Sequence, residues 1–175
     1  MTKNIAVFGS AFNPPSLGHA SVLKRLSMFD QVLLLPSAAH AWGKKMLPFD
    51  IRCQLVDAFI TDLQLANLSL STLEAELLQQ SDSVTTFAVL TALQERDPEA
   101  TFTFVLGPDN LLAFNKFYRS DDILQRWNIM ACPQTVNIRS TMIRDAIAQQ
   151  DAIDAWVTPG VAALISHYSL YQEPA

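Results

Sequence analysis

A short loop that ends in a histidine holds the residues best suited to chemistry. After an apolar run that stops at Phe8, the chain reads Gly9-Ser-Ala-Phe-Asn-Pro-Pro-Ser-Leu-Gly-His19. Small residues let a backbone approach a phosphate closely, and a helix that starts next presents free N–H groups and the positive end of its dipole. The spacing matches neither the dinucleotide-binding glycine pattern nor a P-loop. The loop therefore predicts phosphate binding of a different kind, with His19 in the first turns of the helix.

A second group of suitable residues lies near the end of the chain. Ser140 and Thr141 begin a predicted helix, and Arg144 follows one turn later. Hydroxyl and backbone N–H donors at a helix start bind phosphate oxygens, and a guanidinium adds a planar cation that can bind phosphate in a bidentate way. Taken alone, His19 is more often a capping or surface residue, and Arg144 is more often part of a solvated helix face. Their combination favours binding of a nucleoside triphosphate.

Short apolar runs alternate with amphipathic segments along the chain, as in a parallel sheet covered by helices. Strands are expected at 5–8, 32–35, 68–70, 102–106 and 129–132. Helices are expected at 18–29, 50–60, 84–96, 109–117, 140–149 and 159–167, the last with Thr158 as N-cap and Pro159 in its first turn. We therefore predict an α/β fold, a doubly wound, Rossmann-like parallel sheet with helices on both faces. Ligands of such sheets bind beyond the carboxyl ends of the strands.

Composition predicts one cytoplasmic domain that spans residues 1–175. The formal charge of −5 argues against a nucleic-acid partner, and no apolar run is long enough for a membrane helix. The N-terminus lacks the pattern of a signal peptide. Charged residues make up only 17% of the chain, which leaves a self-associating, homo-oligomeric surface open. Cys53 and Cys132 lie in apolar stretches, as buried thiols of a reducing compartment do, and no metal site is predicted for the protein.

These segments resemble the HxGH-signature nucleotidylyltransferase superfamily, and most closely the bacterial nicotinate mononucleotide adenylyltransferases. The family's opening motif is approximately GGTFDPxHxGH, in which Asn13 here replaces the Asp and Ser16 replaces the first His. The segment Ile138-Arg-Ser-Thr-Met-Ile-Arg144 is similar to the family's ISSTxIR motif. Further matches at 35–37, 48–52, 83–85, 107–110 and 157–171 extend the resemblance over nearly the whole chain. Between Pro133 and Val136 the chain is much shorter than the family.

The resemblance implies transfer of AMP from ATP to a pyridine mononucleotide, with nicotinate mononucleotide preferred, in NAD biosynthesis. His19 and Arg144 are the expected catalytic residues. The residues expected to bind ATP are Gly9, Ser10, Phe12, Ser16, Gly18, Lys44, Gly107, Ile138, Ser140 and Thr141, with Lys45 as the alternative to Lys44. The residues expected to bind the acceptor are Thr85, Asp109, Tyr118 and Phe117, which replaces the family's usual Trp as the ring that stacks on the pyridine.

The chemistry of adenylyl transfer requires no nucleophilic side chain. The acceptor phosphate attacks the α-phosphorus of ATP in line and expels pyrophosphate, so the protein mainly positions anions and offsets developing charge. His19 can carry a proton when anions surround it. Mg²⁺ is expected as cofactor, held mainly by the ATP phosphates.

Three alternatives stay open from the sequence. The acceptor can be nicotinamide mononucleotide or phosphopantetheine, because the reaction core does not specify what carries the attacking phosphate. A degenerate paralogue that binds nucleotide without turnover is the third, and Ser16 in place of the motif His is its best argument. Asp109 can serve as a helix N-cap as well as a ribose ligand.

Overall fold

The strands of the computed structural model form one sheet. The structure describes residues 1–39 and 45–173, so the expected phosphate ligand Lys44 lies outside the described residues. The sheet is five-stranded and parallel, in the order β3-β2-β1-β4-β5. The strands are β1 (Asn4–Ser10), β2 (Gln31–Pro36), β3 (Leu68–Leu70), β4 (Thr101–Leu106) and β5 (Asn128–Ala131). The helices are α1 (Leu17–Leu23), α2 (Phe49–Leu63), α3 (Leu73–Leu78), α4 (Thr86–Arg96), α5 (Pro108–Leu112), the 3₁₀ helix η1 (Phe114–Lys116), α6 (Ser120–Arg126), α7 (Ser140–Ala148) and α8 (Pro159–His167).

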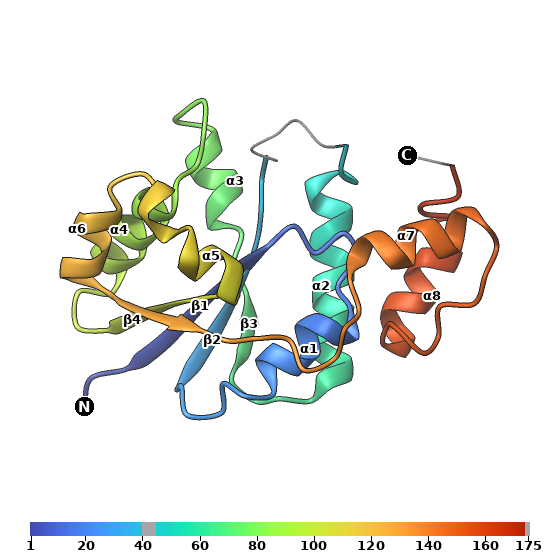
Figure 1. Cartoon of the computed structure of the whole chain (residues 1–175), viewed down its shortest axis with the longest axis horizontal. Coiled ribbons are helices and arrows are strands. Elements are labelled where there is room, and N and C mark those ends of the chain that lie inside the picture. Colours follow the sequence, from blue (N-terminus) through green and yellow to red (C-terminus); the bar gives the residue numbers. More distant parts are fainter. Residues whose placement is uncertain (40–44, 174–175) are drawn as a thin grey trace.

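Helices cover both faces of the sheet, which confirms the predicted doubly wound, Rossmann-like fold (Figure 1). Successive side chains of a strand point to opposite faces, and the central strand β1 supplies both cores. Its Ala6 and Phe8 pack with α1, α2, α7 and α8, whereas Ile5 and Val7 pack with α3, α4 and α6. Because β1 is buried on both sides, its carboxyl end delivers the following loop to a fixed place between the two helical layers.

The helix expected at 18–29 is wrong in length, because α1 ends at Leu23. Beyond it the chain continues in three-residue turns, in which the N–H of Leu26 donates to the carbonyl of Leu23 (3.1 Å) and that of Phe29 to Leu26 (3.2 Å). Leu26 and Phe29 are still buried. A spacing of three residues returns apolar side chains to the same side in both kinds of turn, so the pattern could not tell them apart.

The region after β4 also differs from expectation. The single helix expected at 109–117 is divided into α5 and η1. At Ala113 the chain changes from α-helix to the tighter 3₁₀ helix, in which Phe114 is buried. Asp109 is not the N-cap of α5, since Gly107 occupies that position and Pro108 the first turn. Helix α6, which follows at once, was not predicted.

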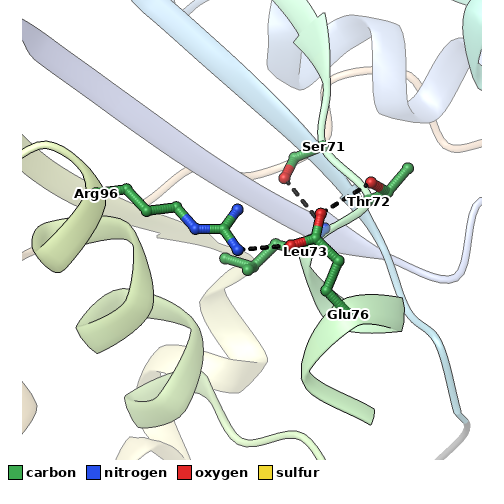
Figure 2. A network of polar contacts seen from close by, with 5 residues as sticks. All are labelled: Ser71, Thr72, Leu73, Glu76 and Arg96. Carbon is green, nitrogen blue, oxygen red and sulfur yellow. Dashed lines mark hydrogen bonds and ion pairs between the residues drawn. The ribbon is translucent and has the colours of Figure 1, made fainter. Parts of the chain in front are cut away.

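Helix α3 was not predicted either, and polar contacts hold its first turn (Figure 2). The Ser71 hydroxyl accepts from the N–H of Leu73 (3.3 Å), and the Thr72 hydroxyl donates to Glu76 (3.3 Å). Glu76 also pairs with Arg96 of α4, but both side chains are about half exposed and such pairs add little stability. Burial of Leu73 is therefore the main reason that this short segment is helical.

The start of α8 is capped by a residue of another helix. Thr158 is the N-cap residue as expected, but its hydroxyl makes no capping bond and is buried without a partner in the part of the chain that the structure describes. Asp62 of α2 accepts instead from the N–H of Gly160 (2.7 Å). The negative charge at the helix start thus comes from a residue almost one hundred positions earlier, which no local pattern predicts. None of the helices in the two described ranges combines the length and apolar character needed to cross a membrane.

Candidate active site

The loop after β1 is buried along most of its length. Phe12 is fully buried and has a positive φ of 47°, a strained value for a residue other than glycine. Its ring lies 4.9 Å from that of His19 and 5.9 Å from that of Phe8, centre to centre. Asn13 is 4% exposed and Ser16 is 0% exposed. This loop is therefore a packed part of the core that ends at the helix carrying His19.

His19 and Ser16 cap helix α1 reciprocally. The Ser16 hydroxyl accepts from the N–H of His19 (3.4 Å), and the N–H of Ser16 donates to Nδ1 of His19 (3.0 Å). This is a capping box in which His takes the place of the usual Glu or Gln at the third helical position. The Ser16 hydroxyl also lies 3.0 Å from Nδ1 of His19. The position of His19 is thus compatible with both roles considered for it, as a capping residue of α1 and as a catalytic residue.

The same contacts fix the protonation of His19. Because Nδ1 accepts from a backbone N–H, the neutral ring carries its proton on Nε2, which lies 3.0 Å from Oγ of Ser10 and donates to it. Burial lowers the pKa of His19 to about 4. The ring is therefore neutral at pH 7, with one N–H donor directed toward Ser10 at the carboxyl end of β1.

Helix α7 is docked on the loop through side chains that were expected to bind phosphate. The Ser140 hydroxyl donates to the carbonyl of Pro14 (2.7 Å). Nη1 of Arg144 donates to the carbonyl of Asn13 (2.8 Å), and its Nη2 to the Thr141 hydroxyl (3.3 Å). A guanidinium has five N–H donors, so Arg144 keeps further donors for an anion while it holds the loop.

Gly18 is required by the approach of the segment before α7. A Cβ atom at this position would lie 2.2 Å from the carbonyl oxygen of Ile138, which is closer than real side chains come. The Ser16 hydroxyl lies 3.4 Å from the same carbonyl. Gly18 was expected to make room for a phosphate, but in the structure it makes room for this neighbouring backbone.

A cavity of about 410 Å³ lies beside His19, at the carboxyl ends of β4 and β5. Its lining includes His19, Asp109, Ile138 and Ser140, which the sequence had singled out. Its other lining residues are Pro108, Pro133, Gln134, Asn137 and Arg139. Arg139 lies within the segment that resembles the family's C-terminal motif but was not among the expected site residues, and the residue types of Gln134 and Asn137 gave no signal.

The residues expected to bind the acceptor do not share one cavity. Thr85 and Tyr118 line a cavity of about 500 Å³, together with residues of α3 and the segment after it. The Thr85 hydroxyl accepts from the N–H of Ala88 (3.1 Å) and caps α4. Phe117 packs against Phe114, with ring centres 4.7 Å apart. Asp109 is exposed beside the His19 cavity.

The remaining expected residues lie at the carboxyl ends of β1 and β4 and in the segment before α2. Gly9 lines a small cavity of about 170 Å³ with Glu74 and Thr86. Gly107 faces open space, and Lys45, the alternative to Lys44, is exposed. A larger cavity of about 600 Å³ between α7 and α8 is lined by none of the residues that were expected to bind ATP or the acceptor.

No metal ligand set was found in the described part of the chain, where no three or more His, Cys, Asp or Glu side chains are grouped suitably. Asp109 is an acidic side chain at the edge of the His19 cavity. A single carboxylate fits a Mg²⁺ ion whose other ligands are phosphate oxygens and water. The presence of such an ion remains a prediction.

Comparison with known proteins identifies a matching family and several similar proteins. The model of the cytidylyltransferase-like family matches residues 7–146. A crystal structure from Vibrio parahaemolyticus, of a protein provisionally named a nicotinate-nucleotide adenylyltransferase, is 49% identical, with a TM-score of 0.88 over 99% of this chain and 98% of that one. A probable nicotinate-nucleotide adenylyltransferase of Myxococcus xanthus is 29% identical over 95% of this chain and 94% of its own length. The nicotinic acid mononucleotide adenylyltransferase of Plasmodium falciparum, solved with NaAD, covers 98% of both chains with a TM-score of 0.78 but only 19% identity, and so supports the fold alone.

Proposed function

The chain belongs to the cytidylyltransferase-like family, and from that premise we propose that it is a nicotinate-nucleotide adenylyltransferase. It transfers AMP from ATP to nicotinate mononucleotide, releases pyrophosphate and so serves NAD biosynthesis in the cytoplasm. The relatives from Vibrio parahaemolyticus and Myxococcus xanthus carry the name of this activity, and each match covers at least 94% of both chains. The observation that carries the proposal is the neutral, buried His19, whose Nε2–H donor lies beside a cavity bordered by the start of α7.

The proposed reaction requires few changes to the contacts of His19 and the loop after β1. An oxygen of the acceptor phosphate forms a bond to the α-phosphorus of ATP. The bond from that phosphorus to the β-phosphate oxygen breaks, and pyrophosphate leaves with the electron pair. Nε2–H of His19 gives up its hydrogen bond to Ser10 and donates instead to a non-bridging oxygen of the α-phosphate. This new hydrogen bond stabilises the negative charge that develops on that oxygen. His19 need not gain a proton first, because the neutral ring already carries one on Nε2 and can donate it in a hydrogen bond.

The remaining donors serve the departing phosphates. Arg139 and the first turn of α7 border the cavity, and Arg144 holds the loop while keeping unused N–H groups. Mg²⁺, held by the phosphate oxygens, would supply the rest of the positive charge. We expect excess chelator to abolish turnover and added Mg²⁺ to restore it. Full turnover in chelator would contradict this part.

Ser16 supports an active enzyme rather than a degenerate nucleotide-binding paralogue. Its hydroxyl and its N–H both lie 3.0 Å from Nδ1 of His19, so this residue orients the imidazole that the reaction needs. A hydroxyl in place of the motif's first His therefore keeps a function in the site. The loss of one phosphate contact is compatible with this function.

An acceptor screen tests the proposal. The purified chain is incubated with ATP, Mg²⁺ and one acceptor at a time, and pyrophosphate release and the dinucleotide product are measured. Nicotinate mononucleotide should give the highest kcat/KM, ahead of nicotinamide mononucleotide. Activity with phosphopantetheine alone would overturn the acceptor assignment but keep adenylyl transfer. ATP binding without pyrophosphate release from any acceptor would favour the degenerate paralogue.

A further inference from the structure

The chain returns to the His19 loop just before its end. After α8, Leu170 is buried and Tyr171 has a positive φ of 62°, which turns its side chain back into the molecule. The Tyr171 hydroxyl donates to Oδ1 of Asn13 at 2.8 Å, across 158 positions of sequence. Burial raises the pKa of Tyr171, so the phenol keeps the proton that this bond requires. The end of the chain is thus bonded to the loop that precedes His19.

Asn13 connects this contact with Arg144. Asn13 is 4% exposed, and among the described residues the other donor to its Oδ1 is the N–H of Leu47, at a long 3.4 Å. Its backbone carbonyl accepts from Nη1 of Arg144 at 2.8 Å. A residue held by its side chain presents its carbonyl in one direction, and that direction decides where the guanidinium lies. Loss of the Tyr171 bond would leave this buried amide oxygen with one weak partner among the described residues, so Asn13 would be held less firmly.

We propose that Tyr171 is a positioning residue, which acts through Asn13 to hold Arg144 in the orientation that binds ATP. This proposal rests on the proposed function only in naming ATP as the ligand. The competing explanation is that Tyr171, like Leu170, merely fills space against the core. The two explanations differ in what the hydroxyl does, because a phenyl ring would fill the same space.

Tyr171→Phe separates the two explanations, since it removes the hydroxyl and keeps the ring. Loss of one buried hydrogen bond should weaken ATP binding and raise KM for ATP by about 3- to 10-fold, with kcat changed far less. The matched control is Tyr168→Phe, in which an exposed tyrosine loses a hydroxyl that donates to Gln54 (3.1 Å). This control should leave KM for ATP unchanged.

A double-mutant cycle with Arg144 supplies the decisive measurement. In an Arg144→Ala background, Tyr171→Phe should have no further effect on the Kd for ATP, measured by calorimetry on the full chain. A space-filling role would instead give equal effects in both backgrounds, or none in either, and would overturn the proposal. Asn13→Asp keeps an acceptor for the phenol and should retain the coupling.

Failure of this proposal and failure of the proposed function give different results. ATP binding that depends on Tyr171, together with no transfer to any acceptor, would count against the proposed function alone. Normal transfer with Tyr171→Phe indistinguishable from the parent would count against the positioning role alone. A parent chain that does not bind ATP would overturn both.

Discussion

The phosphate side of the site and its acceptor side are built differently. The phosphate side, residues 13–19 with 138–144, is held together by hydrogen bonds between its own residues, and its Asn13, Ser16 and His19 are each less than 10% exposed. On the acceptor side, Thr85 bonds within its own helix, Phe117 packs on Phe114, and Tyr118 is 63% exposed. A preorganised region fixes the type of reaction, whereas loosely assembled side chains are easily replaced to suit a different acceptor. We therefore expect substitutions of buried groups on the phosphate side to change kcat or stability, and substitutions of exposed or loosely packed side chains on either side to change KM for the one substrate that they contact.

His19→Ala should give the largest effect. Removal of an N–H donor that acts on developing charge typically costs about 10²–10⁴-fold in kcat, while KM for ATP should change little. Steady-state kinetics with saturating acceptor measures both values. A variant with nearly native kcat would remove His19 from the mechanism.

His19→Gln is the matched control for the capping role. Gln is a usual residue at the third position of a capping box, so α1 should remain capped. The control should recover thermal stability relative to His19→Ala without recovering kcat. Equal activity of the control and the parent would mean that His19 serves as a cap alone.

The second prediction concerns the pH dependence of stability. The pKa of His19 falls from 6.5 to about 4 on folding, so between these values the folded state binds fewer protons than the unfolded one. The contribution of the neutral ring to the free energy of unfolding is complete above about pH 6.5 and is lost as the pH falls toward 4. At ~1.4 kcal/mol for each pH unit, the loss is roughly 3 kcal/mol. Urea unfolding of the parent at pH 8 and pH 4.5 should show it.

His19→Gln again provides the comparison, because glutamine does not titrate. The parent should lose more unfolding free energy than this variant on acidification, since every other titrating group is shared. Parallel curves for the two proteins would show that His19 is not held in its neutral form.

Gly18→Ala tests the packing of the phosphate side. The added Cβ would meet the Ile138 carbonyl at 2.2 Å, so either α1 or the segment before α7 must move. Overpacking of this kind costs about 1–3 kcal/mol, and kcat should fall because both sides of the His19 cavity shift. Chemical denaturation gives the stability change. The stability control is Gly107→Ala, whose Cβ would meet nothing within 4 Å; an equal loss in both variants would contradict the packing argument.

The same contrast explains what could be predicted from the sequence. The apolar run of β1 gave the strand and the alternation of elements gave the sheet, because both depend on local periodicity. Ser16 and His19 contact one another three positions apart, within reach of a local motif. Ser140 and Arg144 reach the loop from 126 and 131 positions away. Their partners are backbone carbonyls, which every residue has, so no residue pattern could have identified these contacts.

Arg139 sharpens the comparison, because it is an exposed cation on the phosphate side that departs from the family's motif serine. Arg139→Ser should raise KM for ATP by about 3- to 10-fold and leave kcat nearly unchanged, since an exposed contact binds ground and transition states alike. The effect should shrink at high salt. Arg25→Ser removes the same charge from an exposed residue outside the cavity lining and should leave KM unchanged. Equal shifts in both variants would indicate a general charge effect.

Phe117→Trp should give the smallest effect, and it falls on the acceptor side. The family usually has Trp here, and an indole offers a larger ring face and an N–H donor to a pyridine nucleotide. Phe117 is half-buried against Phe114, so the larger ring must extend toward open space instead of inward. KM for nicotinate mononucleotide should then fall on the order of 2- to 5-fold, with KM for ATP and kcat unchanged. Measuring kcat/KM for the acid and amide mononucleotides in both proteins separates ring stacking, which improves both acceptors equally, from recognition of the carboxylate, which improves only one. A change in kcat for both acceptors would mean that Phe117 is coupled to the phosphate side after all, and the division between the two sides would fail.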